Sequence, residues 1–188
     1  MTVRSSSWRR SAAGLLAIGA LAVGGLSGCS GRPGAAAVVD GDEISVRELQ
    51  SATSDLGPYL DNVSQTSVLM VLVVAPTFER AAVKAGVGVS DQQAEDLLDQ
   101  AAAAATEAGT VPPRTTAFSD SAIEVAKFTL VQTNLQALPD AGLVSAQVTE
   151  QLDALDATIN PRYGTVDFTS GSIMPPSYPW LVATTPAG

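Results

Sequence analysis

The stretch that decides the fold of this chain is "VVDGDEISVREL", which runs from Val38 to Leu49. Within it, Asp40-Gly41 is a strong turn dipeptide between two short extended pieces, and it predicts a hairpin. Ser45 followed three residues later by Glu48 is a capping box, which predicts that a helix begins directly after the hairpin. Most of the sequence beyond this point has helical periodicity, so the opening strand needs a partner from elsewhere in the chain.

That partner is expected near the other end of the chain. In "INPRYGTVDF", from Ile159 to Phe168, Val166 and Phe168 alternate with Asp167, as in an extended segment. A lone strand leaves its backbone N–H and C=O groups unsatisfied, and no other strand candidate lies near the hairpin in sequence. We therefore predict that the strand near residue 40 pairs with the segment around Ile159 to Phe168. The fold class is then mainly α, with a small β pairing between the N-terminal and the C-terminal strand.

Five helices are expected between these two ends. The first follows Ser45 and is interrupted at Gly57-Pro58, and the others are predicted from apolar residues at helical spacing near 65–85, 90–105, 121–138 and 144–159. Helix 65–85 is the most apolar segment after residue 28, and Pro76 inside it is expected to kink its axis. Ser90 and Gln93 form a second capping box, and the fourth helix is expected to begin near Ser121.

The N-terminus has the three zones of a secretory signal: basic residues, an apolar run of 15 residues from Ala12 to Leu26, and small residues before Cys29. The run is shorter than the ~20 residues that cross a bilayer as a helix, so a permanent transmembrane helix is disfavoured. "LSGC", ending at Cys29, resembles the lipobox of bacterial lipoproteins. The resemblance implies cleavage after Gly28 and a lipid on the Cys29 sulfur that anchors the protein at the outer face of the membrane. The alternative is an ordinary cleaved signal with an incidental cysteine.

Composition restricts the partners. Without residues 1–28 the chain keeps seven basic and nineteen acidic side chains, a net charge of about −12. Such a surface repels phosphate groups, so nucleic-acid binding is not expected, and membrane attachment is expected through the lipid anchor alone. The predicted organisation is a signal peptide at 1–28, a Gly/Pro/Ala tether at 29–36, a helical domain at 37–170 and a proline-rich tail at 171–188.

Several kinds of catalytic chemistry are missing from the sequence. There is no histidine, which excludes His-based general-base catalysis and His-ligated metal sites, and the one cysteine allows no intramolecular disulfide. Asp91, Glu95 and Asp99 share one helical stripe, for which a solvated face is favoured over a calcium or glycosidase site. We expect a non-enzymatic protein with no cofactor, no metal and no catalytic residue.

The order of these motifs resembles the N-terminal domain of the periplasmic chaperone SurA and its relatives. The matching residues are Asp40-Gly41, Ile44-Ser45, the step from Ala82 to Val87, and Val89-Ser90-Asp91. "NPRYGTVDF", from residue 160, resembles the closing segment of SurA-like lipoproteins from high-GC Gram-positive bacteria, a source that also fits eight Arg against two Lys. Members often carry a parvulin prolyl-isomerase domain, for which this chain has no segment. The resemblance therefore implies only a helical cradle for extended, unfolded polypeptide.

Two sets of candidate site residues follow. The candidate peptide-contacting residues are apolar positions on the second and fourth predicted helices: Leu72, Phe78, Val125, Phe128 and Leu135. They form either ordinary core or an open groove. The family-motif turn comprises Asn160, Pro161, Arg162, Tyr163 and Gly164. Either Arg162 and Tyr163 recognise a ligand, or Pro161 and Gly164 shape a turn while Tyr163 packs and Arg162 pairs with an acid.

The expected function is that of a membrane-anchored, extracytoplasmic chaperone-like protein that binds unfolded or extended exported polypeptides. The alternative is a structural or adaptor lipoprotein of the envelope that binds one specific folded partner. A hydrolase is a distant third and would need converging carboxylates.

Overall fold

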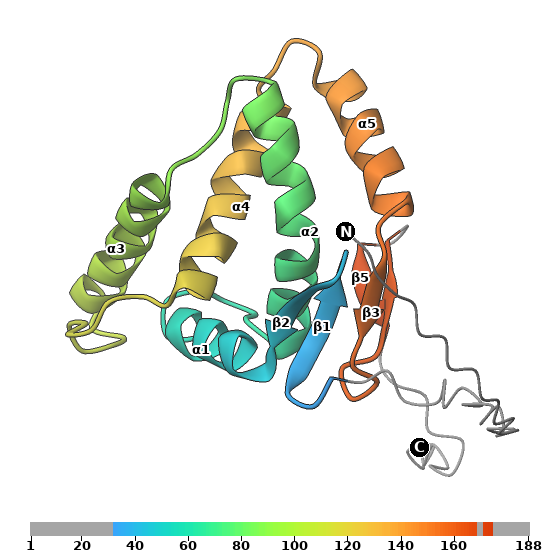
Figure 1. Cartoon of the computed structure of the whole chain (residues 1–188). Helices are drawn as coiled ribbons and strands as arrows, with labels where there is room; N and C mark the ends of the chain where they lie inside the picture. The colour runs from blue at the N-terminus through green and yellow to red at the C-terminus, as the bar shows by residue number, and fades with distance from the viewer. Residues whose placement is uncertain (1–31, 169–170, 175–188) are drawn as a thin grey trace, which may run out of the picture. The chain divides into compact units, whose positions relative to one another are not determined.

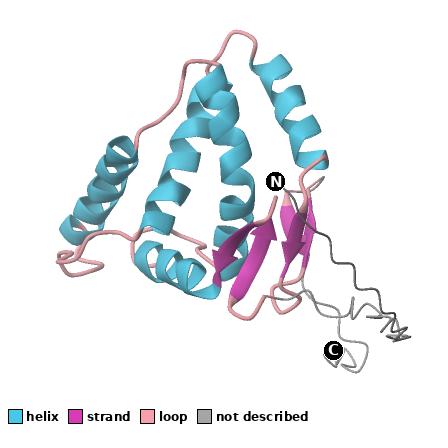
Figure 2. Ribbon diagram, viewed as in Figure 1, coloured by secondary structure: helices cyan, strands magenta, loops and turns pink. Residues whose placement is uncertain are grey.

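The computed structural model describes residues 32–168 and 171–174. The predicted signal peptide, the lipid anchor at Cys29, and residues 175–188 of the predicted tail lie outside the described residues. The described part of the chain is mainly helical, with a small antiparallel β element. Figure 2 shows the strands gathered at one side of the helices. The predicted fold class is confirmed.

The hairpin forms where the Asp40-Gly41 dipeptide predicts it. β1 (Ala35–Val39) and β2 (Asp42–Ser45) pair in antiparallel register, with Val39 opposite Asp42. Asp40 and Gly41 have φ values of 51° and 93°. Positive φ at both central residues is the requirement of a type I′ turn, which asparagine, aspartate and glycine satisfy best.

The two ends of the domain pair as predicted. β1 is the middle strand of the sheet β2-β1-β3 and pairs antiparallel with β3 (Ala157–Ile159), with Ala37 opposite Ile159. The Asn160 N–H extends the ladder by donating to the Ala36 carbonyl at 2.9 Å. This pairing brings together two strands more than a hundred residues apart in the sequence, and all five described helices lie between them along the chain.

The predicted extent of the C-terminal strand is wrong. Residues 165–168 do not pair with β1; instead β4 (Thr165–Asp167) pairs with β5 (Ser172–Met174) in a separate two-stranded sheet. The chain turns after Ile159, where Tyr163 N–H donates to the Asn160 carbonyl at 2.9 Å and Gly164 has a φ of 118°. This turn redirects the backbone away from β1, so only the residues before it can join the first sheet.

Three helices begin at a capping box. α1 (Val46–Leu56) and α3 (Asp91–Glu107) start at the predicted boxes of Ser45 and Ser90. α2 (Gln65–Lys84) starts at a further box, formed by Ser64 and Ser67, that was not predicted. Each box pairs two backbone N–H groups that the helix would otherwise leave without acceptors. α2 continues through Pro76 and ends next to Gly86, whose φ is 74°.

The two last helices differ from their predicted bounds. α4 (Asp120–Gln136) begins after Ser119, within a residue of the expected start near Ser121, because the N–H groups of Ala122 and Ile123 donate to the Ser119 carbonyl at 2.9 and 3.0 Å; it ends two residues before 138. α5 (Ala141–Asp153) stops short of residue 159. Ala157 to Ile159 form a strand because they pair with β1. This tertiary contact overrides the helical spacing of Leu155 and Ile159.

α2 is the central helix. It packs against α1, α4, α5 and strand β1, with α4 alongside it in Figure 1. Within the described residues, α2 is the one helix long and apolar enough to cross a membrane by those two criteria, but eight of its side chains are buried in the core of this domain. The core continues through Leu49 and Leu56 of α1.

Candidate functional site

A groove lies between α4 and α5 of the described molecule. It has a volume of about 450 Å³, with Phe78 of α2 as its one lining residue from a third helix. The remaining lining residues come from α4 and α5: Gln132, Leu135, Gln136, Ala141, Gly142, Val144, Ser145, Val148, Thr149 and Leu152. A hollow of this volume falls within the range of ligand pockets in proteins.

The lining of this groove contains no charged side chain. Its floor is apolar, with Leu135 and Val148 buried and Phe78 half-buried. Its rim is polar but neutral, since Gln136 and Ser145 are exposed. In a chain with a net charge of −9, an uncharged apolar floor with amide and hydroxyl groups at its edge suits an uncharged, extended ligand better than an ion.

The outer wall, α5, is held less firmly than the other helices. Val148 is its only buried residue, and Leu143 is 68% exposed. Its N-cap residue, Asp140, makes no side-chain capping bond, and the hydrogen bond from Thr149 to the Ser145 carbonyl stays inside the helix. Little apolar burial holds α5 against α2 and α4, so small movements of this wall have a low free-energy cost.

The candidate peptide-contacting residues separate into two groups. Phe78 and Leu135 line the groove. Leu72 and Phe128 are buried and Val125 is half-buried, and all three pack in or against the main core. Phe128 stands edge-on to Phe78 with ring centroids 5.0 Å apart, so it supports the groove floor from behind.

The α5 wall was not predicted from the sequence, from which a groove on the second and fourth helices alone was expected. Its signal was present: Val144, Val148 and Leu152 recur at four-residue spacing on a helix otherwise rich in polar residues. Periodicity shows which face of a helix is apolar, but not which neighbour that face meets.

The family-motif turn is built as a structural corner. Asn160 donates from Nδ2 to the Ala35 carbonyl at 2.9 Å, and its Oδ1 accepts from the Arg162 N–H at 3.2 Å. Tyr163 is buried, and a Cβ on Gly164 would collide with the Met174 carbonyl oxygen. These contacts join the turn to β1 and β5, which accounts for Asn, Tyr and Gly at these positions without a ligand. Pro161 and Arg162 are exposed.

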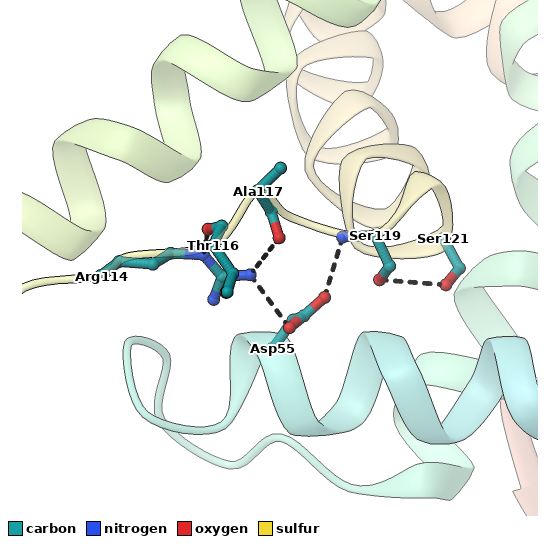
Figure 3. A network of polar contacts seen from close by, with 6 residues as sticks. All are labelled: Asp55, Arg114, Thr116, Ala117, Ser119 and Ser121. Atoms are coloured by element: carbon teal, nitrogen blue, oxygen red, sulfur yellow. Dashed lines mark hydrogen bonds and ion pairs between the residues drawn. The ribbon is translucent and has the colours of Figure 1, made fainter.

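A polar network fixes the α3–α4 connection to α1, and Figure 3 shows it around Asp55. Asp55 accepts from Arg114 Nη2 at 3.0 Å and from the Ser119 N–H at 2.8 Å. Arg114 also donates to the Ala117 carbonyl and lies 3.7 Å from the centroid of the Phe118 ring. Burial acts to raise the pKa of Asp55, but the hydrogen bonds from Ser119 and Arg114 outweigh it, so this pKa lies below its ordinary value.

A second charged cluster joins α2, α3 and α4. Lys127 Nζ lies 2.8 Å from Asp91 Oδ1 and 3.4 Å from Glu79 Oε1, a buried oxygen that takes part in this longer ion pair. Burial and then repulsion from Glu79 raise the pKa of Glu124, against the effect of Lys127. The hydrogen bond to Asp91, against the effect of burial, raises the pKa of Lys127. Within the described ranges, no group of three or more Asp, Glu or Cys side chains is arranged to hold a metal ion.

Comparison of the chain with protein-family models, with curated proteins and with solved structures finds no match. The assignment of function therefore depends on the groove and on the sequence motifs.

Proposed function

We propose that this protein is a membrane-anchored, extracytoplasmic chaperone-like protein, and that it binds extended apolar segments of exported polypeptides in the α4–α5 groove. The observation that carries the proposal is the groove itself: an apolar floor and a neutral rim in an otherwise acidic molecule.

The chemistry of the groove matches that of an unfolded segment. The free energy falls when apolar side chains of such a segment leave water for the apolar floor of the groove. Its backbone N–H and C=O groups need partners, and Gln136 and Ser145 can each donate and accept. With only a few neutral polar groups around an apolar floor, the groove would select ligands by their shape and hydrophobicity and not by their exact sequence. A chaperone that binds many different polypeptides needs this kind of selectivity.

The position at the membrane rests on the lipobox-like "LSGC" and on the Gly/Pro/Ala tether that follows it. A lipid on Cys29 would hold the domain at the surface where exported chains emerge unfolded. The acidic surface of the domain adds no attraction to anionic headgroups, so anchoring would depend on the lipid.

The test is suppression of aggregation by the full chain, without ATP, for several unrelated denatured proteins. We expect near-stoichiometric amounts to slow aggregation, and Gln136→Glu to weaken the effect severalfold because it places a charge beside the bound apolar segment. Gln147→Glu is the matched control, since Gln147 is exposed on α5 and does not line the groove. Unchanged aggregation with the wild-type chain would refute the proposal.

One observation favours the second candidate, an adaptor that binds a single folded partner. Val83 and Leu143 are 71% and 68% exposed. They belong to the end of α2 and the start of α5, two helix ends that lie at the same end of the domain in Figure 1. A folded partner with an apolar surface could cover both helix ends at once. An adaptor would leave aggregation unaffected and would lose one dominant partner on Leu143→Asp.

A further inference from the structure

We propose that the α4–α5 groove is occupied, in the absence of other polypeptides, by the chain's own C-terminal segment from Tyr178 to Val182. The inference deepens the proposed function, because it names a ligand for the same groove. It does not require that foreign polypeptides bind there.

The first argument is chemical. Residues 175–188, "PPSYPWLVATTPAG", contain no charged side chain, although the chain as a whole has 29. Tyr178, Trp180, Leu181 and Val182 are four large apolar or amphipathic residues within five positions. This is the most apolar stretch of the C-terminal part of the chain, and the lining of the groove has no charged side chain to oppose its burial. Left in water, these side chains would expose apolar area that the groove can cover.

The second argument is where the segment starts. Ile173 of β5 is buried in the main core cluster, and Phe78 and Leu152 of the groove pack against that same cluster. β5 also contacts α2, which contributes to the groove floor. The last described strand before the tail therefore lies beside α2, the helix that contributes Phe78 to the groove.

The third argument is reach and cost. The six residues from Pro175 to Trp180 span up to about 20 Å when extended. Three prolines before Trp180 restrict the backbone of the unbound segment, so fewer conformations are lost when it binds. Attachment to the same chain also makes binding intramolecular, which gives a high effective concentration at the groove.

Trp180 provides a direct test, since Trp8 is the only other tryptophan in the chain. In the full chain with Trp8→Phe, we expect Trp180 to emit at shorter wavelength and to be quenched by acrylamide severalfold less than in a peptide of residues 171–188. Gln132→Glu combined with Gln136→Glu keeps side-chain shape but adds charge to the groove, and should restore quenching toward the peptide value. Gln147→Glu should leave it unchanged.

Three outcomes would overturn the inference. Trp180 could be quenched as strongly as in the peptide, or it could be protected without any response to the groove variants. Its protection could also vanish on dilution, which would show that the tail binds a second copy.

A parallel arm separates this inference from the proposed function. A denatured client added to the Trp8→Phe chain should raise the quenching of Trp180 by displacing the tail, and Trp180→Ser should increase client binding. Protection of Trp180 by the groove with no effect of any client would leave the inference standing and refute the chaperone function. If Gln136→Glu weakens client binding while Trp180 is quenched as strongly as in the free peptide, the chaperone function would stand and the inference about the tail would be refuted.

Discussion

At the scale of single residues, a few positions have a role that only one type of residue can fill. Gly164 is the clearest, because it combines a left-handed φ of 118° with a direct approach to the Met174 carbonyl. Asp55 is another, since both of its carboxylate oxygens accept hydrogen bonds from the α3–α4 connection. Neither position contacts the groove, so their substitution tests the fold without touching the proposed function.

Gly164→Ala should lower the free energy of unfolding by at least about 2 kcal/mol, because the new Cβ collides with backbone and the φ is strained for alanine. Urea denaturation measures the loss. Gly142→Ala is the control: Gly142 lies in α5 with no atom within 4 Å of a new Cβ, and alanine there should stabilise by about 0.5–1 kcal/mol. Equal effects of the two substitutions would contradict this view of the turn.

Asp55→Asn should cost about 1–3 kcal/mol at neutral pH by removing a charged hydrogen-bond acceptor from Arg114 and Ser119. The pKa of Asp55 is lower in the folded than in the unfolded state, so the unfolded chain binds more protons as the pH falls. The stabilisation is present above the unfolded pKa and is lost as the pH falls through the folded pKa. Urea titrations over the acidic range should therefore show a flatter loss of stability in Asp55→Asn, and an unchanged slope would count against the network.

At the scale of elements, the contact between α2 and α4 contains an electrostatic conflict. Glu79 and Glu124 face each other with Lys127 as the nearest cation, and Asp91 of α3 shares that cation. Elsewhere the same helices pack through apolar residues such as Phe78 and Phe128. Lys127 of α4 offsets part of this repulsion, because it forms ion pairs with Glu79 of α2 and with Asp91 of α3.

Glu124→Gln should stabilise the protein at neutral pH, on the order of 0.5 kcal/mol, because it removes a carboxylate that burial and Glu79 disfavour. The sign is opposite to that of Asp55. The folded-state pKa of Glu124 is raised, so the folded state binds more protons and loses stability as the pH rises from the unfolded pKa through the folded one. Thermal unfolding at several pH values measures it. The control Glu150→Gln changes an exposed residue of α5, and an equal gain there would refute the explanation.

At the scale of the whole molecule, the β1–β3 ladder joins the two ends of the domain. The Asp40 N–H donates to the Asp156 carbonyl at 2.8 Å and the Asn160 N–H to Ala36 at 2.9 Å. Antiparallel ladders alternate, so the Thr158 N–H faces Val38 between these two bonds, while the N–H of Ala157 faces away from β1.

Thr158→Pro should therefore destabilise the whole domain by about 2 kcal/mol or more, since it removes the central N–H donor of the ladder and leaves the Val38 carbonyl unsatisfied. Helical circular dichroism should be lost in a single transition at lower urea. Ala157→Pro is the matched control, because proline is tolerated on an edge strand where its missing N–H does not face the ladder. Helices that stay folded while the ladder opens would show that the ends do not close the domain.

The sequence by itself determined the features that depend on neighbours along the chain. Asp40-Gly41 specifies its turn through backbone φ, and Ser45 and Ser90 cap their helices through residues three positions away. The closing of the domain could also be predicted, because an opening strand without a partner has a definite cost. Only the tertiary structure decided where β3 ends and which wall completes the groove. Those outcomes depend on contacts such as Gly164 with Met174 and α5 with α2, which join residues that no local pattern brings together.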